Sequence, residues 1–147
     1  KTAPGGETAA YADMQRARCL AHGDKPERAL AVYNRFRKEH AQSVWADDAL
    51  LRAGVLCAGP LADPGRAAGY FRELLSAHPD GDRAETAYLY LATLAWWTGE
   101  WREAERLHRA FLEKYPESPF REEFLTVRLP AIAARRTTVG GTEGSVR

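Results

Sequence analysis

The sequence predicts an all-α protein: a solenoid, or α-α superhelix, of three helix pairs followed by a C-terminal helix. Three observations lead to this fold class. An alanine early in each expected second helix recurs as Ala29, Ala67 and Ala104, at intervals of 38 and 37 residues. A helix stop and a polar turn follow each of these helices. No window alternates apolar and polar residues with hairpin turn signals, so no sheet is expected.

Each alanine is followed by large side chains at offsets that share one face of a helix. Four residues later stand Tyr33, Phe71 and His108, and seven residues later stand Phe36, Leu74 and Phe111. Eleven residues later the helices are expected to stop, at His40, His78 and Tyr115. Because one helix pair cannot bury its own apolar face, the repeat implies that the pairs stack on one another.

The same pattern sets the expected bounds of the helices. The first helices of the pairs are expected over 7–22, 44–58 and 83–98, and the second helices over 25–40, 64–78 and 100–115. Asp24 with Glu27 fits a capping box. Asp63 before Pro64 fits a capped start with proline at the first helical position.

A terminal helix is expected over 119–135, with Phe120, Phe124 and Val127 facing inward to complete the array and Pro130 kinking or ending the helix. The predicted domain is 7–136, with repeats over 7–40, 44–78 and 83–115. Residues 1–6 and 137–147 are rich in glycine and lack apolar periodicity. We expect both to be disordered tails or linkers.

Composition restricts the possible functions. Lys and Arg total 21 and Asp and Glu total 20, so the formal net charge is +1. A nucleic-acid-binding surface usually carries a clear basic excess, so no nucleic-acid partner is expected. No apolar stretch reaches the ~18 residues of a transmembrane helix, so no direct membrane insertion is expected.

No constellation of residues indicates an enzyme, a cofactor or a metal site. Phosphate loops, His-Glu-x-x-His and nucleophile elbows are missing. His40 and His78 occupy one repeat position, which favours a structural role at the helix end. Cys19 and Cys57 are expected to be small buried hydrophobic residues. The alternative for the cysteines is a disulfide between repeats, which needs Cα atoms within ~7 Å.

The third unit, "AETAYLYLATLAWWTGEWREAERLHRAFLEKYPES", resembles a tetratricopeptide repeat. Its Gly99, Trp101, Ala104, Phe111 and Pro116 stand where that motif has a turn glycine, an aromatic residue, alanine, an apolar residue and proline. The departures are Ala92 for glycine, Ala95 for a large aromatic residue and His108 for an aromatic residue. The resemblance implies a non-catalytic scaffold that binds a protein or peptide.

The longer repeat and the "YP.S" ending resemble a subset of the family. This subset includes the outer-membrane lipoprotein of barrel assembly and the coordinator of the Tol-Pal system. The resemblance implies a bacterial protein in the periplasm or associated with the cell envelope, with the cytoplasm as the alternative.

In the family the first helices line a concave groove. Carried over residue by residue, the predicted groove positions are Asp13, Arg16, Arg52, Val55, Leu89, Tyr90, Thr93 and Trp97, together with Asp48, Leu51 and Thr86. The Lys and Asn of the family's carboxylate clamp are missing here, which argues against binding of chaperone tails. The groove residues favour a partner segment with an apolar anchor followed by an acidic residue.

Three tryptophans surround the turn of the third unit. Trp101 is expected in the core, whereas the consecutive Trp96 and Trp97 point about 100° apart and cannot both be buried on one side. One should pack against the next helix. The other is either merely half exposed or an anchor for a partner, since tryptophan is enriched at binding hot spots.

Two further functions remain open on the sequence. The chain could be an oligomerisation or linker module whose ends stack on neighbouring copies or on further repeats. It could also be a sensor domain of a longer chain, as the linker-like tails suggest. A polar outer face on the last helix would mark a complete array and favour the binding scaffold over self-association.

Overall fold

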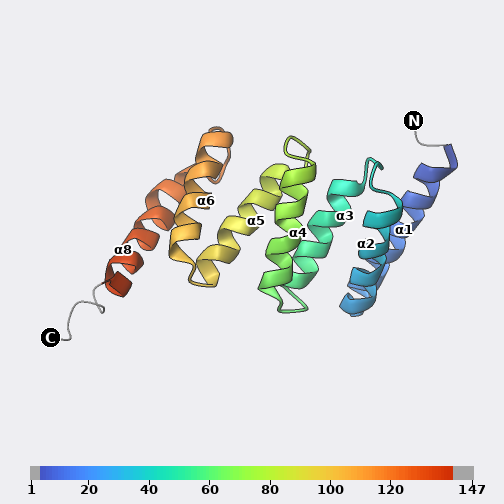
Figure 1. Cartoon of the computed structure of the whole chain (residues 1–147), viewed down its shortest axis with the longest axis horizontal. Coiled ribbons are helices and arrows are strands. Elements are labelled where there is room, and N and C mark those ends of the chain that lie inside the picture. The colour runs from blue at the N-terminus through green and yellow to red at the C-terminus, as the bar shows by residue number, and fades with distance from the viewer. Residues whose placement is uncertain (1–3, 141–147) are drawn as a thin grey trace. The chain divides into compact units, whose positions relative to one another are not determined.

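A computed structural model describes the chain from Pro4 to Gly140 (Figure 1). Three helix pairs occur in order: α1 (Pro4–His22) with α2 (Pro26–Glu39), α3 (Ala46–Ala58) with α4 (Pro64–Ala77), and α5 (Ala84–Trp97) with α6 (Trp101–Lys114). They are followed by α7 (Arg121–Glu123), the π-helical turn η1 (Phe124–Arg128) and α8 (Leu129–Gly140). No strand occurs in the described range, which confirms the all-α fold class of successive helix pairs.

The chain divides into two compact units, Lys1–Ala87 and Tyr88–Arg147, here called the N-unit and the C-unit. The boundary falls inside α5. In the N-unit α1 packs on α2, α2 on α3 and α3 on α4. In the C-unit α6 packs on α8, and the rings of Tyr88 in α5 and Phe111 in α6 lie 6.2 Å apart. Helices that follow one another in the chain therefore pack together within each unit.

The repeat register predicted from the alanines matches the observed core. Ala29, Ala67 and Ala104 have no exposed surface. The residues four and seven positions later are also buried, namely Tyr33, Phe71, His108, Phe36, Leu74 and Phe111. A small residue followed by large ones on one stripe lets neighbouring helix backbones approach while the large side chains fill the space beside the crossing.

The chain makes the same backbone turn after each second helix. His40, His78 and Tyr115 cap the helices, and their amides donate to the carbonyls of Phe36, Leu74 and Phe111. The carbonyl groups of the three capping residues accept from the amides of Ser43, Gly81 and Ser118. The carbonyl groups of those residues accept in turn from Ala46, Ala84 and Arg121. The recurring stop in the sequence is therefore one turn conformation used three times.

Gly54 in α3 lies where α3 and α4 approach each other closely. A Cβ atom at this position would overlap ring carbons of Phe71, a fully buried residue of α4. The ring has no free space into which it can move, because interiors are close-packed. We expect Gly54→Ala to lower the free energy of unfolding by about 1–2 kcal/mol, as overpacking typically does. Urea unfolding followed by circular dichroism measures this change.

Gly69 in α4 is the matched control for this substitution. It is exposed, and a Cβ atom there would meet nothing within 4 Å. Gly69→Ala should therefore raise the free energy of unfolding by about 0.5–1 kcal/mol, because alanine is the better helix former. Changes of the same sign in both variants would show that the α3–α4 crossing is not as close as described.

The last helix differs from its prediction in which residues face inward. Phe124 has no exposed surface, but Phe120 and Val127 are exposed, so the expected inward stripe is wrong at two of three positions. The buried residue that follows is Ile132, eight positions after Phe124. A π turn takes more residues per turn than an α turn. Because of the extra residue in η1, the position that faces inward after Phe124 comes about one residue later than in a regular α-helix. Phe124 and Ile132 therefore lie on the same side.

Pro130 does not end the helix, contrary to one of the two expected outcomes. It lies one residue inside α8, directly after η1. Proline has no amide hydrogen, and in an α-helix its ring clashes with the carbonyl four residues back. In η1 the amide of Leu129 donates to Phe124, five residues back. A π turn of this kind inside a helix is a recognised cause of a local change in helix direction. Here it precedes Pro130, and the helix continues beyond the proline.

The helix ends also correct some predicted bounds. The tail expected over 1–6 is wrong for Pro4–Gly6, which form the start of α1, and residues 1–3 lie outside the described range. The tail expected over 137–147 is wrong for 137–140, which belong to α8, and residues 141–147 lie outside the described range. Asp63 caps α4 by accepting from the amide of Arg66 at 2.9 Å. Asp24 does not cap α2, whose N-cap is Lys25.

Candidate binding surfaces

The groove residues predicted in the N-unit differ in their surroundings. Arg16 is exposed and Val55 is half-buried. Asp13 of α1 is bound across the pair by α2, because Arg35 Nη2 lies 2.5 Å from its Oδ1 and His40 Nε2 lies 3.7 Å from its Oδ2. Asp48 and Leu51 are buried. Of the predicted set in this unit, Arg16, Arg52 and Val55 present accessible surface to a partner, and so does the half-buried Asp13, although its carboxylate is paired with Arg35.

Arg52 belongs to an ion network around the buried Asp48 that sequence patterns did not show. Its Nε lies 2.6 Å from Oδ2 of Asp48. The other carboxylate oxygen of Asp48, Oδ1, forms an ion pair with Nε of Arg83 at 3.1 Å. Tyr33 of α2 lies close enough to Arg52 and Asp48 for their charges to act on its phenol. Burial raises the pKa of the Tyr33 phenol, which stays neutral. Asp48 therefore ties α3 to the residue before α5, and Arg52 is paired with Asp48 within α3.

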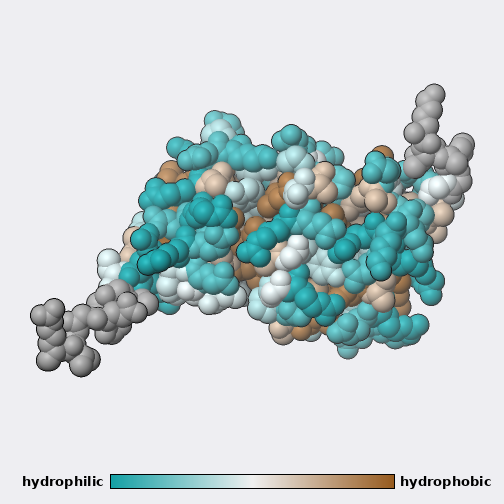
Figure 2. Space-filling model, in the orientation of Figure 1, coloured by the Kyte–Doolittle hydropathy of each residue, from teal (hydrophilic) through white to brown (hydrophobic). Residues whose placement is uncertain are grey.

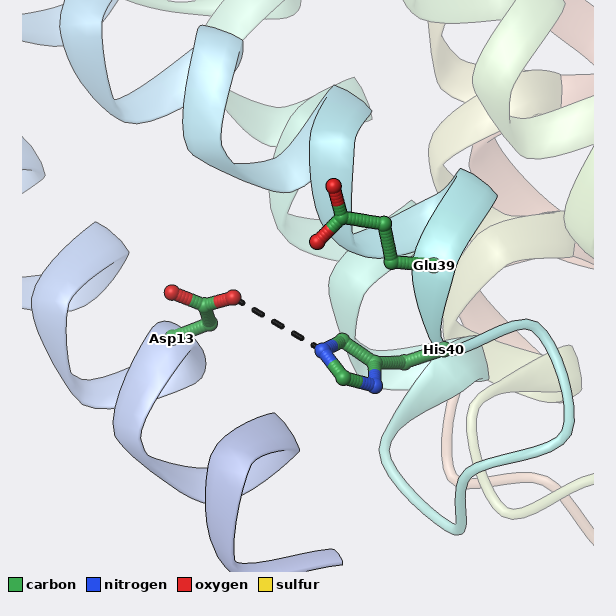
Figure 3. A group of neighbouring side chains, drawn as sticks. All are labelled: Asp13, Glu39 and His40. Carbon is green, nitrogen blue, oxygen red and sulfur yellow. Dashed lines mark ion pairs between the residues drawn. The ribbon is translucent and has the colours of Figure 1, made fainter. Parts of the chain in front are cut away.

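Asp13, Glu39 and His40 form the one group of potential metal ligands found among the described residues (Figure 3). Their ligand atoms lie within 4.8 Å of one another. Arg35 already pairs with Asp13, and its Nε lies 3.6 Å from Glu39. The guanidinium supplies the positive charge that two neighbouring carboxylates need. The group therefore fits an ion-pair cluster at the end of α2 better than a cation site.

The predicted groove residues of the C-unit lie along α5. Tyr90, Thr93 and Trp97 are spaced i, i+3 and i+7 and so share one helix face. Trp97 is 80% exposed and Tyr90 is 37% exposed, while Leu89 and Thr93 are half-buried. A tryptophan exposed to this extent is the largest departure from core packing among the described side chains. The structure thus places an exposed aromatic surface at the C-terminal half of α5.

Trp96 has the opposite role to its neighbour Trp97. The guanidinium of Arg128, in η1, lies 5.0 Å from the centre of the Trp96 ring. Arg128 also donates to Thr93 Oγ1 at 2.7 Å and to Glu123 at 2.7 Å. Trp96 therefore contacts η1, a later element than the next helix, against which one of the two tryptophans was expected to pack. Arg128 holds Thr93 as well, so this groove residue is tied to η1.

Two other predictions about single side chains are corrected. Trp101 is half-buried rather than in the core, and Arg135 of α8 lies 5.3 Å from its ring centre. Cys19 is exposed, whereas Cys57 is buried as expected. Both thiols are free, so the alternative of a disulfide between repeats is wrong. Burial raises the pKa of the Cys57 thiol, which reduces its reactivity at neutral pH.

A pocket of about 540 Å³ lies in the N-unit between the turn after α2 and the C-terminal end of α4. Val44, Leu50 and Ala77 contribute apolar surface to its lining, and His78 and the ion pair of Arg37 with Glu73 contribute polar surface. The Arg37–Glu73 distance is 3.1 Å, and Arg37 also covers the ring of Tyr70. Sequence reasoning missed this pocket because its walls come from elements far apart in the chain.

The faces of the second helices are mainly polar. Figure 2 shows hydrophilic residues over the surfaces of α2 and of α6 that face the viewer. On α6, Arg106 pairs with Glu103 at 2.7 Å and Arg109 with Glu105 at 3.0 Å, at helical i,i+3 and i,i+4 spacings. Exposed pairs of this kind contribute little to stability. They keep this face of α6 solvated.

No described helix combines the length and the apolar character needed to cross a membrane. The fold and the surface together define a helical-repeat protein with an exposed aromatic face. Residues 11–43 and 86–118 match the family model described as tetratricopeptide repeat. These segments correspond to the first and third helix pairs with their turns. The two matches support a place for the chain in the tetratricopeptide-repeat family, whose members generally mediate protein–protein interactions. No curated protein matches the sequence.

Proposed function

We propose that the chain is a scaffold that binds a protein or peptide segment along its first helices, with Trp97 as the main anchor. Support comes from the family matches and from the exposed face of α5. A tetratricopeptide-type array is typically a non-catalytic scaffold. The segment that fits the α5 face carries an aromatic or aliphatic side chain.

The observation that carries this proposal is the exposure of Trp97. Its indole is 80% exposed although Trp96, the preceding residue, is held by Arg128. Removing a large apolar side chain from water is favourable, so a helical protein gains stability by packing such a residue where it can. Large exposed aromatic groups instead mark interaction surfaces, and tryptophan is enriched among the residues that dominate binding energy.

Truncation of this side chain tests the proposal. The partner is captured with the wild-type chain as bait, and its affinity is then measured by titration calorimetry. We expect Trp97→Ala to weaken binding at least tenfold, which corresponds to about 1.4 kcal/mol. The melting temperature should stay unchanged, because Trp97 contributes little to the core.

Two control variants separate the α5 face from the rest of the C-unit. Phe120→Ala removes an aromatic ring that is also exposed, and Arg109→Ala removes a charge from the polar face of α6. Both should leave affinity within about threefold of wild type, as expected outside a hot spot. Loss of binding in either control, with Trp97→Ala unaffected, would move the binding site away from α5.

The cellular location of the chain and of its partner is also a proposal. We propose that the partner belongs to a bacterial cell-envelope assembly, on the basis of the resemblance of the repeat length and "YP.S" turn to envelope members of the family. Fractionation of cells that express the full-length gene tests this location. Recovery with the cytosolic fraction alone would contradict it.

A further inference from the structure

His108 is the buried titratable side chain that the proposed binding function does not use. It lies in α6 and has no exposed surface. Its Nδ1 lies 2.7 Å from the carbonyl oxygen of Ala104, one helical turn back. A carbonyl oxygen only accepts, so Nδ1 carries the hydrogen, and Nε2 of the neutral ring is an acceptor. This Nε2 is buried and has no hydrogen-bond partner among the described residues.

The side chain that covers His108 comes from the end of the chain. The ring centre of Phe124, the first residue of η1, lies 4.4 Å from that of His108 and 5.0 Å from that of Phe111. We call η1 and α8, residues Phe124–Gly140, the terminal segment. Its α8 packs on α6 as well. The terminal segment therefore docks on α6 through an apolar cluster that contains an imidazole.

The charged groups around this cluster offer the imidazole no counter-ion. From η1, the positive charge of Arg128 disfavours protonation of His108, and from α7, Glu123 favours it. Glu123 is already bound to Arg128 at 2.7 Å. From α8, Arg136 pairs with Glu105, which belongs to α6 itself.

The remaining charged and titratable groups near His108 also provide no counter-ion for a protonated imidazole. Arg135 of α8 lies over the ring of Trp101, and Arg109 of α6 is engaged with Glu105. From α5, Tyr88 packs on Phe111, and burial raises the pKa of its phenol, so it stays neutral. A proton on Nε2 of His108 would thus place a positive charge in an apolar site beside the positive charge of Arg128. Burial of such an unpaired charge is strongly unfavourable.

We propose that His108 makes the docking of the terminal segment sensitive to pH, so that protonation in mildly acidic solution releases the segment from α6. Release would give Nε2 access to water and separate the imidazolium from Arg128. It would also remove the ring of Phe124 from that of Phe111, a buried apolar residue of α6. The apolar face of α6 would then be available for other contacts.

The direction of the effect follows from proton linkage. Burial lowers the pKa of docked His108 below its ordinary value of 6.5, and Arg128 acts in the same direction, against the bond to Ala104 and the charge of Glu123. The released state therefore binds more protons than the docked state. Docking is fully stable above pH 6.5 and weakens as the pH falls from 6.5 through the lowered pKa. One proton taken up on release changes the equilibrium by at most about tenfold per pH unit.

Hydrogen exchange of the whole chain, measured between pH 7.5 and pH 5.0, tests the proposal. Rates are first divided by the intrinsic exchange rate at each pH. We expect the protection of the terminal segment to fall below pH 6.5 with a slope that approaches tenfold per pH unit, while α3 and α4 keep their protection. His108→Phe should remove this slope. The substitution suits the site because Phe71 occupies the equivalent repeat position.

His78→Phe is the matched control, since His78 caps α4 in the N-unit and should leave the pH slope of the terminal segment unchanged. If His108→Phe does not fold, titration of the His108 ring in the wild-type chain by NMR replaces it. A midpoint below 6.5 that coincides with loss of protection supports the proposal. Protection independent of pH, a slope retained in His108→Phe, or a midpoint at or above 6.5 would each overturn it.

Discussion

Phe124→Ala is expected to lower the free energy of unfolding of the C-unit by about 3–5 kcal/mol, the usual cost of deleting a buried phenylalanine. The ring is fully buried and contacts three side chains at once: His108, Phe111 and Arg128. Deletion leaves a cavity against α6 that the surrounding helices can fill only in part. Urea unfolding at pH 7.5, followed by circular dichroism and by tryptophan fluorescence, measures the loss.

Leu125→Ala is the control, because Leu125 is the next residue and is 41% exposed. It should cost less than about 1 kcal/mol, since most of its side chain already meets water. The difference in stability loss between Phe124→Ala and Leu125→Ala tests the burial of Phe124. It also tests which residues of the π turn face inward. Equal losses in the two variants would mean that the terminal segment packs in another register.

Asp48→Ala should destabilise the N-unit by about 2–3 kcal/mol. Its carboxylate is buried and serves Arg52 at 2.6 Å and Arg83 at 3.1 Å. Breaking a fully buried ion pair by removing one partner costs about 3–5 kcal/mol. The expected loss is smaller here because the side chains of Arg52 and Arg83 are 38% and 44% exposed and can turn toward water. Urea unfolding provides the measurement.

The ion pair of Arg37 with Glu73 gives the matched comparison within the same unit. Both side chains are substantially exposed, so Glu73→Ala should cost less than about 1 kcal/mol. Raising the salt concentration should reduce that small effect further, because exposed pairs are screened. If Asp48→Ala costs no more than Glu73→Ala, the network around Asp48 contributes no more than a surface pair.

Periodicity in the sequence was sufficient to predict the fold class and the core stripes of the second helices. The alanines and the large residues after them are local in sequence, and their offsets follow directly from helix geometry. The helix stops could also be predicted, because each turn is formed by backbone hydrogen bonds between residues close in the sequence. The residues that end the helix therefore recur at the repeat interval.

Features that depend on packing between distant elements were not predictable in this way. Asp48 has the sequence context of an exposed groove residue, but it is buried and paired with Arg83, which belongs to a distant part of the chain. The π turn before Pro130 likewise changes which residues face inward. A prediction that assumes about 3.6 residues per turn throughout cannot include this change. Cys19 and Trp101 were expected to be buried from their repeat positions, and both are more exposed in the structure.

The candidate site was predicted in part for the same reasons. Trp97 was assigned to the groove from the family resemblance, whereas the angle of about 100° between Trp96 and Trp97 predicted only that the two could not both be buried on one side. Asp13 could not be recognised as a partner of Arg35, since the pair joins different helices. The pocket beside His78 left no pattern in the sequence at all.

The turn that follows each second helix also bears on how such a chain can change in length. Its hydrogen bonds join the residues at positions 40, 43 and 46, and again at the two later repeats, without help from other helices. A stretch of one repeat could therefore be duplicated or deleted between two of these turns while every helix kept its own start and end. Recombination in a gene would change such an array by whole helix pairs, and a protein engineer would place a graft at the same three joints.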